Sequence, residues 1–250
     1  MKNYVISLAT AHDRREHIKA EFGKQGIEFA FFDAVTPDNI ERISTQLNIP
    51  LANNQRLSLG EKACFLSHVF LWQKMIDDNL EHIAIFEDDV YLGENAVAFL
   101  QDDWLNFPFD IIKLETWHEL VHLGKPIIHH HGRALHPLKS THVGACGYII
   151  SKDHACSLMG YLQHDFDIHG QAIDHILFGN TCINSTIYQL NPALAIQSDR
   201  HDNTLKSTLE ATRNNRYEQP MTLIQQFNRR MKTWKRSILK RLVYKIVPFK

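Results

Sequence analysis

The stretch "IAIFEDDVYL", residues 83–92, decides the fold class of this chain. Its first four residues are an apolar run of the kind that forms a short buried strand. Three consecutive carboxylates, Glu87, Asp88 and Asp89, follow directly. In an open α/β sheet, ligands bind at the carboxyl ends of the strands. The stretch therefore predicts an α/β fold with an acidic site at the end of a strand.

The acidic triplet allows two interpretations. Adjacent carboxylates repel one another, so either solvent or a bound cation must compensate their charge. A solvated acidic turn is the simpler possibility. The other is a site for Mg²⁺ or Mn²⁺, because these hard cations prefer oxygen ligands and are often completed by a substrate's phosphates. The position at a strand end favours the metal site, but the triplet alone leaves both open.

The segments around the triplet alternate between strand and helix patterns. Strands are expected over residues 4–8, 27–32, 82–86, 109–114 and 141–151. Helical spacing of apolar residues predicts helices over 11–26, 57–79, 152–162 and 170–178. This alternation predicts a mostly parallel sheet with flanking helices.

Charge is distributed unevenly along the chain. The 250 residues have the hydrophobic and charged content of an ordinary globular protein, 44% and 22%. Residues 1–212 carry a net charge of −11, whereas residues 213–250 carry +10. We therefore expect one domain over 1–212 and a basic tail over 213–250.

The tail has the pattern of an amphipathic helix. Apolar residues recur at spacings of three and four among the basic ones, at Ile224, Phe227, Met231, Trp234, Ile238 and Leu242. Such a helix fits an anionic membrane surface. The alternative is a helix packed on the domain. Nucleic acid is not expected as a partner, because the acidic domain would repel it.

The cysteines and the apolar segments indicate the cellular compartment of the protein. The four cysteines show no C-x-x-C spacing, which predicts reduced thiols rather than a disulfide framework or a zinc site. The opening "MKNYVISLAT" does not have the pattern of a signal peptide. No apolar run approaches the roughly 20 residues of a membrane span. We expect a cytoplasmic protein.

Histidines concentrate between residues 115 and 142, where helical and strand periodicity are both lost. They are His118, His122, His129, His130, His131, His136 and His142. A His-rich tract can bind metal. However, three consecutive histidines cannot all point the same way, and no helical H-x₃-H pair is evident. The segment is predicted to be a solvated loop that covers the site.

Three stretches, in this order, resemble glycosyltransferase family 25, which includes bacterial lipopolysaccharide and lipooligosaccharide glycosyltransferases. They are "YVISLATAHDRREHI" (4–18), "LSLGEKACFLSHVFLWQKM" (57–75) and "IAIFEDDVYL" (83–92). The middle stretch is the most specific, because it looks like the family's G-E-x-A-C-x-x-S-H helix. The similarity continues weakly to about residue 200.

The resemblance implies a GT-A-like, Rossmann-related fold and a transferase. The expected reaction moves a hexose, galactose in preference to glucose, from a UDP-sugar to a lipid-linked saccharide of lipooligosaccharide or lipopolysaccharide, with inversion. Mn²⁺ or Mg²⁺ would neutralise the donor's diphosphate. The resemblance also places the protein at the inner face of the cytoplasmic membrane.

Most site residues follow from the matched motifs; Asp33, which ends the second strand, and His201 lie outside them. Asp89 is the expected direct metal ligand, with Asp88 and Glu87 acting through water or on the donor ribose; His201 could complete the metal site. Donor contacts are expected from Leu8, Arg14, Asp33, Glu61, Ser67 and His68. For Arg14 an exposed position at a helix start remains an alternative, as does simple capping for Asp33.

The expected general base is Asp174, in the first turn of a helix that begins near Gly170. Asp165 and Asp167 are rivals, and Asp174 could instead only stabilise its own helix. Two other functions compete with the transferase. A nucleotidyltransferase would also use strand-end carboxylates, but the segment after the first strand lacks its Gly-rich loop. The other is a noncatalytic membrane-tethered module that binds saccharide or nucleotide.

Overall fold

The computed structural model of the chain describes residues 1–164, 171–179, 185–202 and 243–250. Its centre is a sheet of eight strands in the order β2-β1-β3-β10-β5-β11-β9-β8. These strands are β1 (Lys2–Ser7), β2 (Ala30–Asp33), β3 (His82–Glu87), β5 (Ile111–Lys113), β8 (Ile128–His130), β9 (Arg133–Pro137), β10 (Gly147–Ser151) and β11 (Ile187–Asn191).

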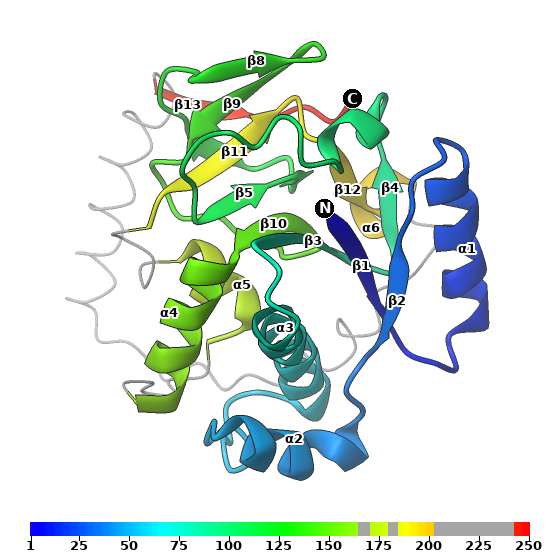
Figure 1. The fold of residues 1–250 in the computed structure, drawn as a ribbon, viewed down its shortest axis with the longest axis vertical. Coiled ribbons are helices and arrows are strands. Elements are labelled where there is room, and N and C mark those ends of the chain that lie inside the picture. The colour runs from blue at the N-terminus through cyan, green and yellow to red at the C-terminus, as the bar shows by residue number, and fades with distance from the viewer. Residues whose placement is uncertain (165–170, 180–184, 203–242) are drawn as a thin grey trace, which may run out of the picture.

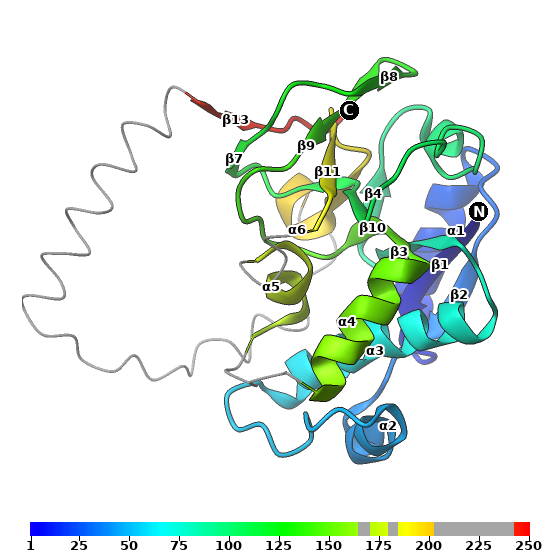
Figure 2. The same cartoon turned by 60° about the vertical axis from the view of Figure 1, so that its left-hand side comes forward.

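Helices cover both faces of this sheet (Figure 1 and Figure 2). They are α1 (His12–Gly23), α2 (Ile40–Leu47), α3 (Leu59–Asp77), α4 (Lys152–His164), α5 (Ile173–Phe178) and α6 (Ser198–His201), with the 3-10 turns η1 (Pro37–Asn39) and η2 (Ala96–Phe99). Helices α2, α3, α4 and α5 pack on one face, while α1 and η2 pack on the other. The predicted α/β class is confirmed.

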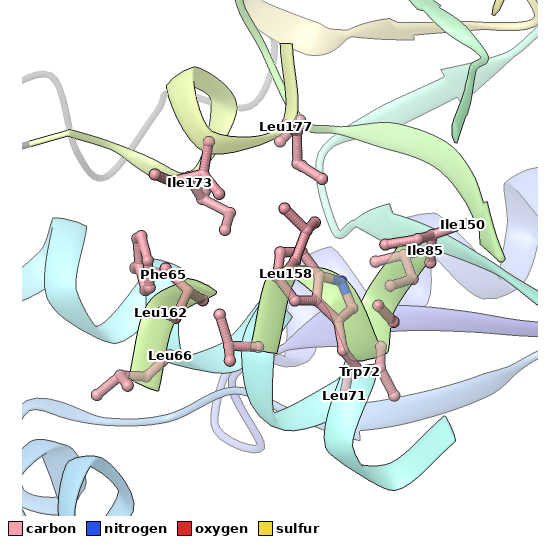
Figure 3. Close-up of a cluster of buried hydrophobic side chains, with 14 of the residues drawn as sticks. Phe65, Leu66, Leu71, Trp72, Ile85, Ile150, Leu158, Leu162, Ile173 and Leu177 are labelled. Atoms are coloured by element: carbon pink, nitrogen blue, oxygen red, sulfur yellow. The ribbon is translucent and has the colours of Figure 1, made fainter. Parts of the chain in front are cut away.

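Alternation along the central strands explains why both faces are apolar. In β1, Tyr4 and Ile6 face α3, whereas Val5 faces α1. In β3, Ile85 packs against α3 and α4 (Figure 3), and its neighbour Phe86 lies on the opposite face. Each large side chain buried in this way contributes roughly 1.5–3 kcal/mol to folding.

The sheet is mixed, so the prediction of a mostly parallel sheet is wrong. Strand β1 is parallel to both β2 and β3, and β5 is parallel to β11. Strand β10, however, is antiparallel to both β3 and β5, and β9 is antiparallel to β11 and β8. A parallel neighbour requires a long crossover, usually a helix. The chain between β5 and β10 contains short strands and no helix.

The His-rich segment is also not the solvated loop that was predicted. It forms β6 (Glu115–Thr116), β7 (Leu120–His122) and the hairpin β8–β9. The hairpin lies at the opposite end of the sheet from β1 and β2. His130 stacks on Trp104 with ring centroids 5.7 Å apart, and Leu135 is buried. Cross-strand pairing and aromatic stacking stabilise strands too short to show a periodicity.

The last residues of the chain pack on the domain. Strand β13 (Tyr244–Ile246) pairs with β7, and the small sheet β4-β12-β6 is formed by β4 (Val90–Leu92), β12 (Ala195–Gln197) and β6. Val247 is buried against Val121 and Ala193. The amphipathic helix predicted over 224–242 lies outside the described residues. Among those that are described, no helix is long and apolar enough to cross a bilayer.

Candidate active site

The order of the parallel strands creates a binding crevice. From β1 the chain runs through α1 to β2 on one side, and then through α3 to β3 on the other. The carboxyl ends of β1 and β3 therefore form a topological switch point, which is where open α/β sheets bind ligands. A pocket of about 380 Å³ lies there. Its lining includes Ser7, Leu8, Arg14, Cys64, Ser67, His68, Glu87, Asp88, Asp89 and Gln197.

Asp88 is held firmly by two partners. The hydroxyl of Ser7 donates to Oδ2 of Asp88 at 2.7 Å, and Nη1 of Arg14 lies 2.5 Å from Oδ1. Burial acts to lower the pKa of Arg14, but Asp88 and Asp89 together outweigh it, and the pKa is raised. Arg14 is thus a cation fixed at the edge of the acidic cluster that Glu87, Asp88 and Asp89 form. Asp88 places it there.

Asp89 is buried with much less compensation. Oδ2 lies 3.5 Å from Arg14 and accepts a hydrogen bond of 3.3 Å from Gln197. Oδ1 is buried and has no hydrogen-bond partner among the described residues. Burial, followed by repulsion from Glu87, raises the pKa of Asp89 to about 7. This carboxylate can accept a cation.

Glu87 faces both the acidic cluster and helix α3. Its Oε2 accepts a hydrogen bond from Gln197 at 3.3 Å. Its Oε1 lies 3.5 Å from Nε2 of His68 and 3.8 Å from Sγ of Cys64. Cys64 and His68 are four residues apart on α3, so both point toward the end of β3.

His68 is fixed in orientation by a buried aromatic pair. Its Nδ1 lies 2.9 Å from the hydroxyl of Tyr148, which also accepts a hydrogen bond of 3.0 Å from Nε1 of Trp72. All three side chains are fully buried. Nε2 of His68 is thereby directed at the pocket.

Three other residues that were predicted to contact the UDP-sugar make contacts within the protein. Asp33, at the end of β2, is exposed and forms an ion pair with Arg15. Ser67 lines the pocket, accepts from the backbone N–H of Val35 at 2.8 Å and donates to a carbonyl of its own helix. Glu61 forms a capping box with Ser58 at the start of α3, with hydrogen bonds of 3.0 and 3.2 Å.

The predicted base and the predicted histidine ligand lie apart from the pocket lining. Asp174 is half-buried in the first turn of α5, where its carboxylate accepts from the backbone N–H of Gly144 at 3.1 Å and of His175 at 2.9 Å. His201 is exposed on α6 and packs against Tyr91 and Phe249, with ring centroids 5.0 and 5.5 Å away.

Ser7, Gln197 and Tyr148 are among the residues of the site that were not predicted. Ser7 ends the first strand, so the strand-end rule that selected Glu87 could also have found it. Gln197 ends β12, which is far from the motifs in the sequence and reaches the pocket only through the small sheet. Tyr148 is a core aromatic of β10, and nothing local indicates that its hydroxyl orients His68.

Comparison with known proteins agrees with the geometry. The model of glycosyltransferase family 25 (LPS biosynthesis protein) matches residues 1–177. The lacto-N-neotetraose biosynthesis glycosyltransferase LgtB of Neisseria meningitidis serogroup B is 46% identical over 211 residues, 79% of this chain and 75% of that protein. The lipooligosaccharide biosynthesis protein lic2B of Haemophilus influenzae is 40% identical over 221 residues, 84% and 82% of the two chains.

A solved glycosyltransferase involved in glycosylation of the PBCV-1 major capsid covers 78% of this chain and 91% of its own, at 11% identity and a TM-score of 0.43. That likeness is too weak to carry an argument. The family match over residues 1–177 and the two relatives, 40% and 46% identical over most of this chain, are sufficient. The chain belongs to glycosyltransferase family 25.

Proposed function

We propose that the protein is a metal-dependent glycosyltransferase that moves a hexose from a UDP-sugar to a saccharide of lipooligosaccharide or lipopolysaccharide. The observation that carries this proposal is the acidic triplet at the end of β3, lining a pocket at the switch point of the sheet. Family membership and the names of the relatives support the reaction class. The parallel unit β2-β1-β3 supports a GT-A-like domain.

The residues of the acidic cluster fit a divalent cation. Oδ1 of Asp89 is buried without a hydrogen-bond partner among the described residues, and the carboxylates of Glu87, Asp88 and Asp89 all interact with Arg14. Asp89 and Glu87 would hold the ion, while Asp88 is occupied by Ser7 and Arg14. When bound, such an ion supplies positive charge to the donor's diphosphate, which is the leaving group.

Other residues of the pocket would position the donor. The Arg14 guanidinium is held by Asp88 beside the acidic cluster, where its positive charge favours a phosphate group of the donor. Leu8 is 40% exposed at the pocket and offers an apolar surface to a base or sugar ring. A pocket of about 380 Å³ is within the usual range for small ligands. Galactose is the favoured hexose, and glucose is the alternative.

Inversion at the anomeric carbon requires a general base on the acceptor side. Asp174 remains our proposal for this base. It lies in the first turn of α5, where its carboxylate accepts hydrogen bonds from two backbone N–H groups.

The experiment is to measure UDP release from UDP-galactose and UDP-glucose with Mn²⁺, with and without a lipooligosaccharide acceptor. We expect acceptor-dependent release that is lost in excess EDTA. Asp89→Asn should lower turnover by orders of magnitude while circular dichroism shows an intact fold. Full activity in EDTA would falsify the metal requirement, and donor binding with no transfer to any saccharide would indicate a noncatalytic module. Release of pyrophosphate in a parallel assay with UTP and a hexose 1-phosphate would instead indicate a nucleotidyltransferase.

A further inference from the structure

A second cluster of metal-binding side chains lies next to the acidic cluster in the same pocket. The ligand atoms of Cys64, His68 and Glu87 all lie within 4.8 Å of one another. We propose that these three side chains form a binding site for a thiophilic divalent cation of the Zn²⁺ type. This inference concerns cation binding alone and does not rest on the proposed transferase activity.

The two distances to Glu87 match a single tetrahedral ion. With usual zinc–ligand bond lengths, tetrahedral geometry places an imidazole nitrogen about 3.4 Å and a thiolate sulfur about 3.6 Å from a carboxylate oxygen. In this protein, Nε2 of His68 and Sγ of Cys64 lie 3.5 and 3.8 Å from Oε1 of Glu87. Movements of a few tenths of an ångström would therefore bring both atoms to these distances from Oε1, and the ligand atoms of Cys64 and His68 lie within 4.8 Å of each other. Three protein ligands would leave the fourth position open to the pocket.

Helix α3 presents two of the ligands in the required way. Residues four apart lie on one face of a helix, which is the spacing that zinc-binding helices use for paired ligands. Cys64 and His68 have this spacing, and β3 brings Glu87 opposite them. The spacing of the four cysteines could not reveal this site, because only one cysteine takes part in it.

An unpaired buried nitrogen points into the cluster. His68 is fully buried, and its Nε2 has no hydrogen-bond partner among the described residues. Leaving such a group unpaired destabilises the folded protein, and coordination of a metal ion would remove that cost. Tyr148 holds the other ring nitrogen, Nδ1, as the outer partner of a metal-bound histidine usually does. In the tautomer with its proton on Nδ1, Tyr148 accepts from both His68 and Trp72.

The chemistry of the ligand atoms distinguishes this site from the acidic one. Thiolate and imidazole favour Zn²⁺ and Co²⁺, whereas the oxygens of Asp89 favour Mg²⁺ and Mn²⁺. Glu87 belongs to both sites, because Oε1 faces Cys64 and His68 while Oε2 faces Gln197. A thiophilic cation would therefore occupy the floor of the pocket beside Asp89.

The test is a titration of the metal-free full-length protein with Co²⁺, without nucleotide or acceptor. We expect one equivalent to bind and to produce a thiolate-to-cobalt charge-transfer band in the near ultraviolet. Zn²⁺ should displace it. Competition with a chromophoric chelator should show Zn²⁺ affinity falling at least roughly 100-fold in Cys64→Ser and in His68→Gln, since even loss of an outer partner costs about 10–100-fold.

Two variants serve as controls. Cys156→Ser removes an exposed thiol of α4 and should leave the band unchanged. Asp89→Asn removes a hard ligand of the acidic site and should also retain the band. Circular dichroism checks that each variant is folded. The inference is overturned if the wild-type protein gives no charge-transfer band, or if folded Cys64→Ser gives the same band. Neither result bears on the proposed transferase activity, which the UDP-release assay tests separately.

Discussion

Asp88 and Asp89 are neighbours in the sequence with opposite electrostatic situations. The negative charge of Asp88 is compensated by Arg14 and by the hydroxyl of Ser7, so the carboxylate of Asp88 holds Arg14 in place. Asp89 is buried beside Glu87, and its pKa is raised to about 7. The rise from 3.8 corresponds to about 4 kcal/mol of penalty on the ionised form. A cation at Asp89 would remove much of this penalty, which lowers the folding stability of the metal-free protein.

The pH dependence of stability should report this penalty. A carboxyl group whose pKa is higher in the folded state binds its proton more tightly there, so its contribution to stability falls as pH rises from about 4 to about 7. In EDTA, Asp89→Asn should therefore be more stable than wild type by about 2–4 kcal/mol near pH 7.5 and nearly equal to it near pH 4.

Urea denaturation at the two pH values measures this difference. Mn²⁺ should raise the unfolding midpoint of the wild type and not of the variant. A variant that is less stable than wild type at both pH values would show that the Asp89 carboxylate is not penalised.

The role of Asp174 can be separated from donor binding. A base is needed for transfer but not for binding the UDP-sugar, so Asp174→Asn should retain donor affinity and lose transfer by roughly 10²–10⁴-fold. Asparagine has one acceptor oxygen, so it keeps one of the two hydrogen bonds from the backbone N–H groups of Gly144 and His175 and loses the other, and circular dichroism checks that the fold is retained. Calorimetric titration with UDP and initial-rate assays provide the two readouts. Near wild-type transfer would exclude Asp174, and Asp167 would be tested next.

At the scale of elements, α3 connects stability with the site. It begins at a capping box and carries Cys64, Ser67 and His68 along the pocket. Glu61 was predicted to contact the donor or the acceptor, whereas the structure places it in the capping box of α3. Two variants distinguish these roles. Ser58→Ala should destabilise the protein by about 1 kcal/mol because it removes the cap acceptor. Glu61→Gln should preserve stability and transfer, since glutamine also completes a capping box.

Thermal melting and the UDP-release assay distinguish the outcomes for this pair. A Glu61→Gln variant with unchanged melting temperature and strongly reduced transfer would restore a substrate role for Glu61.

The elements that the sequence predicts are those with continuous or periodic burial. Strand β3 was recognised because both its faces are covered, so its apolar run is unbroken. Helix α3 was predicted at 57–79 and lies at Leu59–Asp77. The strands between residues 115 and 137 are only two to five residues long, so pairing with distant partners decides them. β9, for example, pairs with β11, about 50 residues away.

At the scale of the whole molecule, sequence reasoning found the part of the site made by β1, α3 and β3. These elements carry local motifs and, with Arg14 at the start of α1, meet at the switch point. Arg14, His68 and Asp89 were predicted to share a site, and all three line the pocket there. Gln197 and Tyr148 reach the site through β12 and β10, whose pairing is long-range. Such residues follow from topology, and no local pattern indicates them.

The end of the chain is part of the domain's structure. The carbonyl of Val247 accepts from the hydroxyl of Thr116 at 2.6 Å, and buried Arg133 donates to the carbonyl of Lys250 at 2.5 Å. Gly93 is required beside Lys250, because a Cβ there would overlap that carbonyl. Deleting residues 220–250 would therefore remove β13 and its packing. A test of membrane binding by the tail must keep residues 243–250.

Charge neutralisation provides that test. We expect the tail to bind anionic membranes, because residues 213–250 carry +10 against −11 for the rest of the chain. Each basic residue near an anionic surface contributes about 1 kcal/mol. Replacing five of them by glutamine should therefore weaken binding to phosphatidylserine vesicles at least roughly 100-fold. The five are Arg229, Arg230, Lys232, Lys235 and Arg236.

The matched control changes the same amount of charge on the domain, at exposed Lys2, Lys19, Lys24, Arg42 and Lys125. If the tail is the contact, this control should bind almost as tightly as wild type, because charges away from the surface are screened within a Debye length of about 8 Å at physiological salt. Co-sedimentation with anionic and with neutral vesicles measures both variants. Equal binding by the tail variant and the wild type would instead favour a tail helix packed on the domain, whose apolar stripe is buried by protein and not by lipid.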